Sequence, residues 1–162
     1  MERATEADSH YDNLEAMPLT ELLELMNRED QTVALSVNKQ LPQIEKLADA
    51  AFHCMQGGGR LFYVGAGTSG RLGILDASEC PPTFGVEYNK VIGIIAGGDA
   101  AIRKAVEFAE DDTTAAIKDL ESRGMKSGDI VVGISASGKT PYVLGGLQAC
   151  NSAGITTGCI CC

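Results

Sequence analysis

Residues 60–71 constrain the fold of this chain more than any other stretch. Leu61 to Val64 form a short apolar run that predicts a buried strand. A turn with three glycines follows, and glycine permits a sharp bend and a close approach of the backbone. Thr68 and Ser69 are good N-cap residues, so a helix is expected to open at Ser69. Because a helix N-terminus offers free N–H groups and the positive end of its dipole, the stretch predicts an anion site.

The same turn has other possible interpretations. An ordinary strand-to-helix turn stays open as an alternative. A Walker loop is excluded because no Gly-Lys-Ser/Thr follows at the required spacing. Gly65, Gly67 and Gly70 have the spacing of a dinucleotide fingerprint, but no acidic residue ends a second strand about 20 residues later. Hydroxyl groups beside free N–H groups suit a phosphate monoester better than a pyrophosphate.

Composition narrows the class of protein. The 162 residues are enough for one domain with a substantial core, and the net charge of −9 argues against nucleic acid or an acidic membrane surface as a partner. No apolar run of about 18 residues predicts a membrane span, and the polar start does not resemble a signal peptide. The six cysteines are therefore expected to be reduced thiols in the cytoplasm, and no metal site is predicted among them.

The hydrophobic pattern predicts helices first and then alternating strands and helices. Residues 1–58 are expected to form an arm and helices that add a layer or a dimer surface, with core packing favoured for their apolar faces. Residues 59–162 are expected to form a parallel α/β sheet flanked by helices. The expected helices before the sheet are 18–27, 32–40 and 42–56, with a polar break at 28–30. The expected strands are 61–64, 91–96, 130–134 and 155–162, and the expected helices between them are 69–78 (ended by Pro81 and Pro82), 100–108, 113–122 and 141–153.

A second turn repeats the pattern of the first. Residues 135–140, Ser-Ala-Ser-Gly-Lys-Thr, follow an apolar strand and precede a helix. Two such turns at the carboxyl end of one parallel sheet can converge on one ligand, although each alone could be an ordinary turn. We therefore expect a phosphorylated small molecule to bind both turns, at Gly67, Thr68, Ser69, Gly70, Ser135, Ser137, Gly138 and Thr140.

The chain resembles the N-acetylmuramic acid 6-phosphate etherases over nearly its whole length. The resemblance is carried by residues 26–30, 41–42, 65–84, 95–98, 105–111 and 135–143, of which the run Glu-Cys-Pro-Pro-Thr-Phe at 79–84 is the most specific. These enzymes contain a sugar isomerase (SIS) domain, so the resemblance implies a flavodoxin-like parallel sheet. Lys139 stands where the family usually has arginine, and residues 9–14 depart from the family pattern. The family is roughly twice this length, so the chain is expected to be truncated at its C-terminal end, and residues 1–162 alone to associate and to have little activity.

The resemblance implies cleavage of the lactyl ether of N-acetylmuramic acid 6-phosphate without a metal or organic cofactor. It places the two catalytic acids at Glu79 and Glu110, which match family active-site acids. We expect Glu79, beside Cys80 and two prolines, to be partly desolvated and to protonate the leaving lactate oxygen, and Glu110 to remove the C-2 proton; the two roles could be exchanged. Taken without the resemblance, each is more simply an exposed acid at a helix end or in a charge run.

Two further expectations depend on the resemblance. Glu79 would lie about 15 Å along its helix from Ser69, so either that helix is short or the site is shared in a homodimer. The alternative function is a sugar-phosphate-binding regulator without chemistry, similar to the glucokinase regulatory protein, in which the position of Glu79 is expected to lack a carboxylate.

Overall fold

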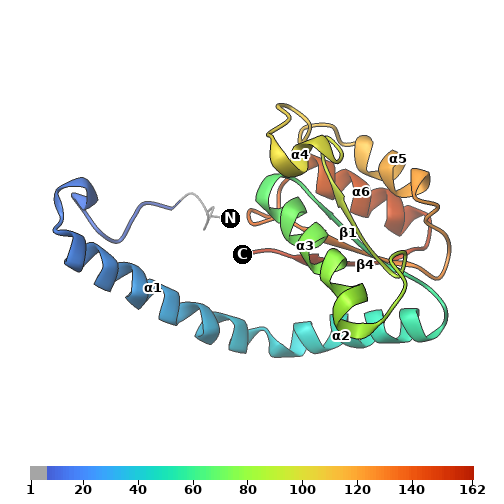
Figure 1. The fold of residues 1–162 in the computed structure, drawn as a ribbon, viewed down its shortest axis with the longest axis horizontal. Helices are drawn as coiled ribbons and strands as arrows, with labels where there is room; N and C mark the ends of the chain where they lie inside the picture. Colours follow the sequence, from blue (N-terminus) through green and yellow to red (C-terminus); the bar gives the residue numbers. More distant parts are fainter. Residues whose placement is uncertain (1–6) are drawn as a thin grey trace. The chain divides into compact units, whose positions relative to one another are not determined.

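The computed structural model describes residues 7–162, which fall into two compact units that divide between Asp49 and Ala50, inside a helix. The described part of the first unit holds the 3₁₀ turn η2 (Leu14–Ala16), then α1 (Leu19–Lys39) and the start of α2 (Leu41–Gln56) (Figure 1). The glycines at 57–59 end α2 as expected, with Gly58 in the left-handed region at φ 86°.

The predicted break at residues 28–30 is wrong, because α1 is one continuous helix. Arg28 and Glu29 are good helix formers, and neither glycine nor proline interrupts the stretch. The Gln31 amide donates to Asn27 Oδ1 at 2.8 Å across the predicted break. None of the described α1 side chains is buried within this single chain.

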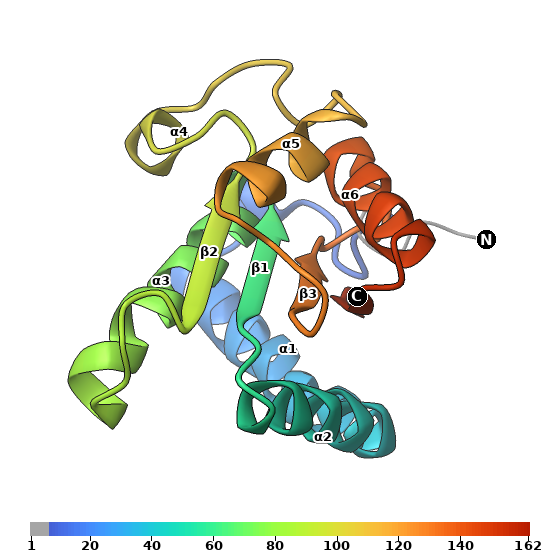
Figure 2. The same cartoon turned by 90° about the vertical axis from the view of Figure 1, so that its right-hand side faces the viewer.

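The second unit is built on a four-stranded parallel sheet, which confirms the predicted fold class. Its strand order is β2-β1-β3-β4, so the chain crosses from β1 to one edge and then returns toward the other (Figure 2). The strands are β1 (Leu61–Gly65), β2 (Val91–Ile95), β3 (Ile130–Ile134) and β4 (Thr156–Ile160). Within the described residues β4 pairs with β3 alone and forms an edge of the sheet.

Helices cover both faces of this sheet. Helix α3 (Gly67–Phe84) lies on one face, and α5 (Ala115–Ser122) and α6 (Pro141–Ser152) lie on the other (Figure 2). The apolar side chains of the central strands fill the space between the layers, and Phe62, Val64 and Val131 are fully buried. No helix formed by residues 7–162 has the length and apolar character needed to cross a membrane.

Two predicted helix ends are wrong. Helix α3 does not stop before Pro81 and Pro82 but continues to Phe84, where Gly85 turns left-handed at φ 67° and donates to the carbonyl of Pro81. The two prolines remove two N–H donors from the last turns of α3, and the Pro81 carbonyl still accepts the hydrogen bond that ends the helix. Helix α4 (Ala100–Arg103) ends well before the predicted residue 108, because Lys104 is extended and Phe108 has a φ of 62° that no helix allows.

Candidate functional site

The sheet brings the two glycine- and hydroxyl-rich turns to the same edge. Strands β1 and β3 are adjacent and parallel, and Gly65 is in register with Ile134 at their carboxyl ends. The turn after Gly65 and the turn after Ile134 therefore start side by side. This is the placement that a ligand shared by both turns requires.

The first turn is unusually tight. A Cβ atom at Gly65 would lie 2.7 Å from Gly70 N, and one at Gly70 would lie 2.8 Å from Gly65 O, so both positions require glycine. Helix α3 begins at Gly67, whose φ of 53° turns the chain two residues earlier than predicted. Ala66 is the N-cap and no side chain caps the helix, so the prediction that Thr68 and Ser69 cap it is wrong. The amides of this first turn are left without a side-chain acceptor.

The second turn is braced by its own side chains. Ser135 is buried, and its hydroxyl lies 2.8 Å from the Thr140 hydroxyl. The Lys139 N–H donates to Ser137 Oγ, and Gly138, at φ 64°, donates to the carbonyl of Ser135. Helix α6 then starts with Pro141, which has no N–H group. The second turn therefore offers fewer free amides than the first, and its donors are mainly hydroxyl groups.

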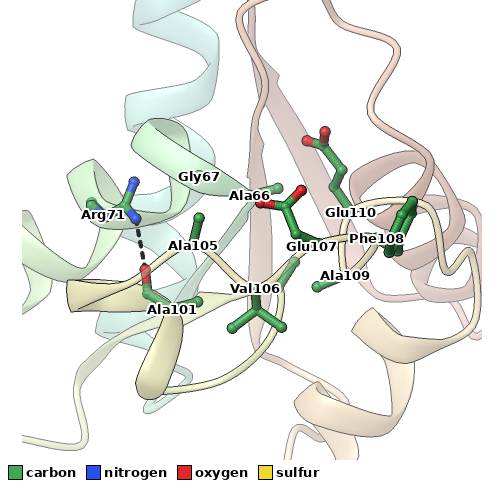
Figure 3. Close-up of a pocket in the computed structure, with 11 residues that line it drawn as sticks. Ala66, Gly67, Arg71, Ala101, Ala105, Val106, Glu107, Phe108, Ala109 and Glu110 are labelled. Atoms are coloured by element: carbon green, nitrogen blue, oxygen red, sulfur yellow. Dashed lines mark hydrogen bonds between the residues drawn. The ribbon is translucent and has the colours of Figure 1, made fainter.

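A cavity of about 170 Å³ lies beside the first turn, between the start of α3 and the segment that follows α4 (Figure 3). Its walls include Gly67 and Arg71 from α3, and Glu107 and Glu110 from the segment. The side chain of Glu110 is exposed to solvent. The structure thus brings one of the two predicted acids next to the first turn.

The second predicted acid, Glu79, does not line this cavity. Because α3 is continuous from Gly67, Glu79 lies about 18 Å farther along the helix at 1.5 Å per residue. The possibility that a short helix brings Glu79 back to the turn is therefore excluded. Glu79 is also exposed, so its expected desolvation by Cys80 and the prolines is not found within the described residues.

Two residues that contact the cavity segment or the helix before it, Arg71 and Tyr142, were given no role from the sequence, and only Arg71 lines the cavity itself. Arg71 donates from Nε to the Ile102 carbonyl and from Nη2 to the Ala101 carbonyl, each at 2.8 Å. Tyr142 donates from its backbone N–H to the Glu110 carbonyl at 2.9 Å. Each is the first charged or aromatic residue of a helix that opens at one of the two turns, and that position is the signal that could have identified them.

The ring of Tyr142 anchors the start of α6. It is fully buried, and its hydroxyl donates to Asp119 Oδ2 at 2.7 Å. Burial and this hydrogen bond to a carboxylate together raise the pKa of Tyr142 far above its ordinary value. The hydroxyl is therefore a fixed donor that holds α6 to α5 rather than a titrating group.

No group of three or more His, Cys, Asp or Glu side chains is placed to hold a metal ion in the part of the chain that the structure describes. All six cysteines are free thiols.

Comparison with known families shows which family the chain belongs to. A family model described as the glucokinase regulatory protein N-terminal SIS domain matches residues 33–151. The chain belongs to this SIS-domain family. The match includes both turns, the cavity segment and Glu79.

Curated relatives match this chain over nearly its whole length. An N-acetylmuramic acid 6-phosphate etherase of Christiangramia forsetii is 60% identical over 98% of this chain and 58% of its own length. An etherase of the same name from Porphyromonas gingivalis is 55% identical over 99% of this chain and 58% of its own length. The resemblance to these etherases is thus confirmed, and the chain spans less than two thirds of their length.

Solved structures support the fold. A phosphoheptose isomerase from Neisseria gonorrhoeae superposes with a TM-score of 0.70 at 18% identity, covering 89% of this chain and 75% of its own. One from Francisella tularensis gives 0.61 at 20% identity, covering 86% of this chain and 74% of its own. At this level of identity the likeness establishes the SIS-type sheet alone.

Proposed function

We propose that this chain is part of a lyase that cleaves the D-lactyl ether of N-acetylmuramic acid 6-phosphate. The observation that carries the proposal is the cavity in which Glu110 lies beside an uncapped, glycine-rich helix start. The phosphate would bind at the first turn, where amides face an anion, and reach the hydroxyl groups of the second turn. The names of the curated relatives, at 52–60% identity, support the same substrate class.

The chemistry needs two carboxyl groups and no redox step. In the open-chain aldehyde form of the sugar, the C-2 proton is acidic, and we assign its removal to Glu110. We assign protonation of the departing lactate oxygen at C-3 to Glu79; the two roles could be exchanged. Addition of water across the resulting double bond restores the proton at C-2 and a hydroxyl at C-3. The products are N-acetylglucosamine 6-phosphate and D-lactate, and each glutamate ends in its starting state.

We further propose that the site is completed by a second copy of the chain in a homodimer. Glu79 lies far along α3 from the cavity that contains Glu110. The cavity of about 170 Å³ is also smaller than the roughly 300–1,000 Å³ of ordinary ligand sites. A second subunit that contributes Glu79 would account for both facts. The free thiols agree with a reducing compartment, the cytoplasm.

A second candidate is a regulator that binds a sugar phosphate without changing it. The observation in its favour is that the matching family model is named for the glucokinase regulatory protein. Such a protein needs the two turns but not the second carboxylate at Glu79. Turnover therefore separates the two functions: a regulator binds the phosphorylated sugar and releases no lactate.

The test uses the protein at the length that its gene encodes, incubated with N-acetylmuramic acid 6-phosphate in deuterated water. We expect Glu79→Ala to abolish D-lactate release while exchange at C-2 continues, and Glu110→Ala to abolish both. Asp111→Ala, an exposed acid next to Glu110, is the control and should retain both. Release of lactate at the normal rate by Glu79→Ala would overturn the assignment, and no release by the unaltered protein would favour the regulator.

A further inference from the structure

The segment that carries the proposed base has little regular structure of its own. Between the end of α4 at Arg103 and the start of α5 at Ala115, the chain forms turns and no helix or strand. Glu107 and Glu110 are exposed along it. A base must be held within a fraction of an ångström to act on a C–H bond. Contacts from outside the segment must therefore hold the Glu110 carboxylate in position.

One support comes from Arg71 at the N-terminal side of the segment. Its guanidinium donates to the Ala101 carbonyl (Figure 3) and to the Ile102 carbonyl, both in the short helix α4. The last carbonyls of a helix have no partner within it, so Arg71 caps this end of α4. Arg71 itself lies on α3, within the second turn of the helix that opens at the proposed phosphate site.

A second support comes from α6 at the other side. The Tyr142 N–H holds the carbonyl of Glu110 itself. Three residues later, a Cβ atom at Gly145 would lie 1.9 Å from the Thr113 carbonyl oxygen, so the backbone after Glu110 lies directly against α6. Between the two supports, Val106 packs on Gly97, where an added Cβ would lie 2.8 Å from its side chain.

We propose that Arg71 is a positioning residue for Glu110, an inference that rests on the proposed function. Arg71 fixes one end of the base-bearing segment to α3, as Tyr142 fixes the other end to α6. Each of these helices begins at one of the two turns that receive the phosphate. The base is therefore held by the same two helices that hold the substrate, which sets its distance from C-2.

Arginine suits this role better than lysine. Its planar guanidinium reaches two adjacent carbonyls with two N–H groups in fixed geometry, as Nε and Nη2 do here. A lysine ammonium is a single point donor on a flexible stem. Arg71→Lys should therefore restore part of what Arg71→Met removes.

The structural test is amide hydrogen exchange on the whole protein. Arg71→Met should speed exchange of the Ile102 and Lys104 amides, which donate to the Asp99 and Ala100 carbonyls, by at least about tenfold. Arg71→Lys should lie between Arg71→Met and the unaltered protein. The control is Arg103→Met, since Arg103 makes no side-chain hydrogen bond to any residue that the structure describes, and it should leave both amides unchanged. If Arg71→Met does not fold, Arg71→Lys is judged against the same control, and unchanged exchange overturns the proposal.

The kinetic test separates positioning from binding. Arg71→Met should lower kcat for lactate release by about 10²-fold, the cost of a misplaced catalytic group, while KM changes little. Exchange of the C-2 proton should fall with it, and Arg71→Lys should recover part of both. A rise in KM with unchanged kcat would mean that Arg71 binds substrate, and this overturns the proposal. If the unaltered protein releases no lactate, the proposed function fails, whereas the amide exchange result still decides whether Arg71 fixes the segment.

Discussion

At the scale of single residues, Asp129 is the buried charge on which the second unit depends. Its carboxylate accepts four hydrogen bonds, three from Arg60 and one from the Lys126 N–H, and its side chain is fully buried. Burial alone would raise the pKa of Asp129, but the bonds from Arg60 and Lys126 outweigh it and hold that pKa below its ordinary value. Asp129→Ala should therefore lower the free energy of unfolding by about 3 kcal/mol at pH 7, the cost of breaking a buried ion pair.

The pH dependence of this effect has a definite sign. Because the folded pKa of Asp129 is depressed, its contribution is complete above the unfolded pKa of about 3.9 and is lost as the pH falls through the folded pKa. Urea unfolding should show the gap between Asp129→Ala and the unaltered protein closing below about pH 4. Asp99→Asn, which removes an exposed acid 3.9 Å from Arg123, should change stability little at any pH. A gap that stays constant from pH 7 to pH 3 would contradict the prediction.

At this scale the sequence predicted which positions need glycine, but it did not predict which groups cap the helices or accept hydrogen bonds from Arg71. The glycine spacing in the first turn predicted a close approach of strand and helix, and Gly65 and Gly70 do lie in contact. The capping role of Thr68 and Ser69 failed because Gly67 starts the helix earlier. Arg71 could not be assigned from the sequence, because its acceptors lie 30 and 31 positions away on a short helix that was expected to run on to residue 108.

At the scale of elements, the segment after α4 carries a conformational cost at Phe108. This residue has a φ of 62° and a side chain that is 82% exposed. A left-handed conformation costs a residue with a Cβ roughly 1–2 kcal/mol, and glycine avoids that cost. Phe108→Gly should therefore raise the free energy of unfolding by about 1 kcal/mol in urea titration, since little packing is lost. Phe108→Ala keeps the Cβ and is the control; an equal gain from alanine would contradict the strain argument.

Element prediction succeeded where burial dictates the pattern. Strands β1, β2 and β3 are short apolar runs beside turn residues, and the expected bounds lie within a few residues of the observed ones. The bounds expected for β4 are also close, although most of its residues are polar or exposed. Prediction failed where a short sequence signal, such as a proline pair or an apolar run, disagrees with how the residues pack in the folded chain. Pro81 and Pro82 read as a helix stop, yet they lie inside α3. The apolar residues Ala105, Val106 and Phe108 suggested a helix, yet Val106 contacts Gly97 and Phe108 has a left-handed φ of 62°.

At the scale of the whole molecule, the separation of Glu79 from the Glu110 cavity leads to a test of the shared site. A twofold symmetric dimer would form each site from Glu79 of one chain and Glu110 of its partner. Glu79→Ala and Glu110→Ala proteins are then each inactive alone. When they are mixed in equal amounts and exchange subunits, half of the dimers are mixed, and one site in each mixed dimer has both glutamates. Lactate release should recover to about one quarter of the unaltered rate.

The recovery distinguishes a shared site from a site within one chain. If both glutamates acted in the same chain, every site in every dimer would lack one of them, and mixing would restore nothing. A mixture of Glu79→Ala with Glu79→Gln is the matched control, because no dimer in it contains Glu79 and no recovery is expected. Two affinity tags on the two variants verify that mixed dimers have formed. Absence of recovery in a sample with proven mixed dimers would contradict the shared site, since each mixed dimer contains one intact Glu79 and one intact Glu110 on different chains.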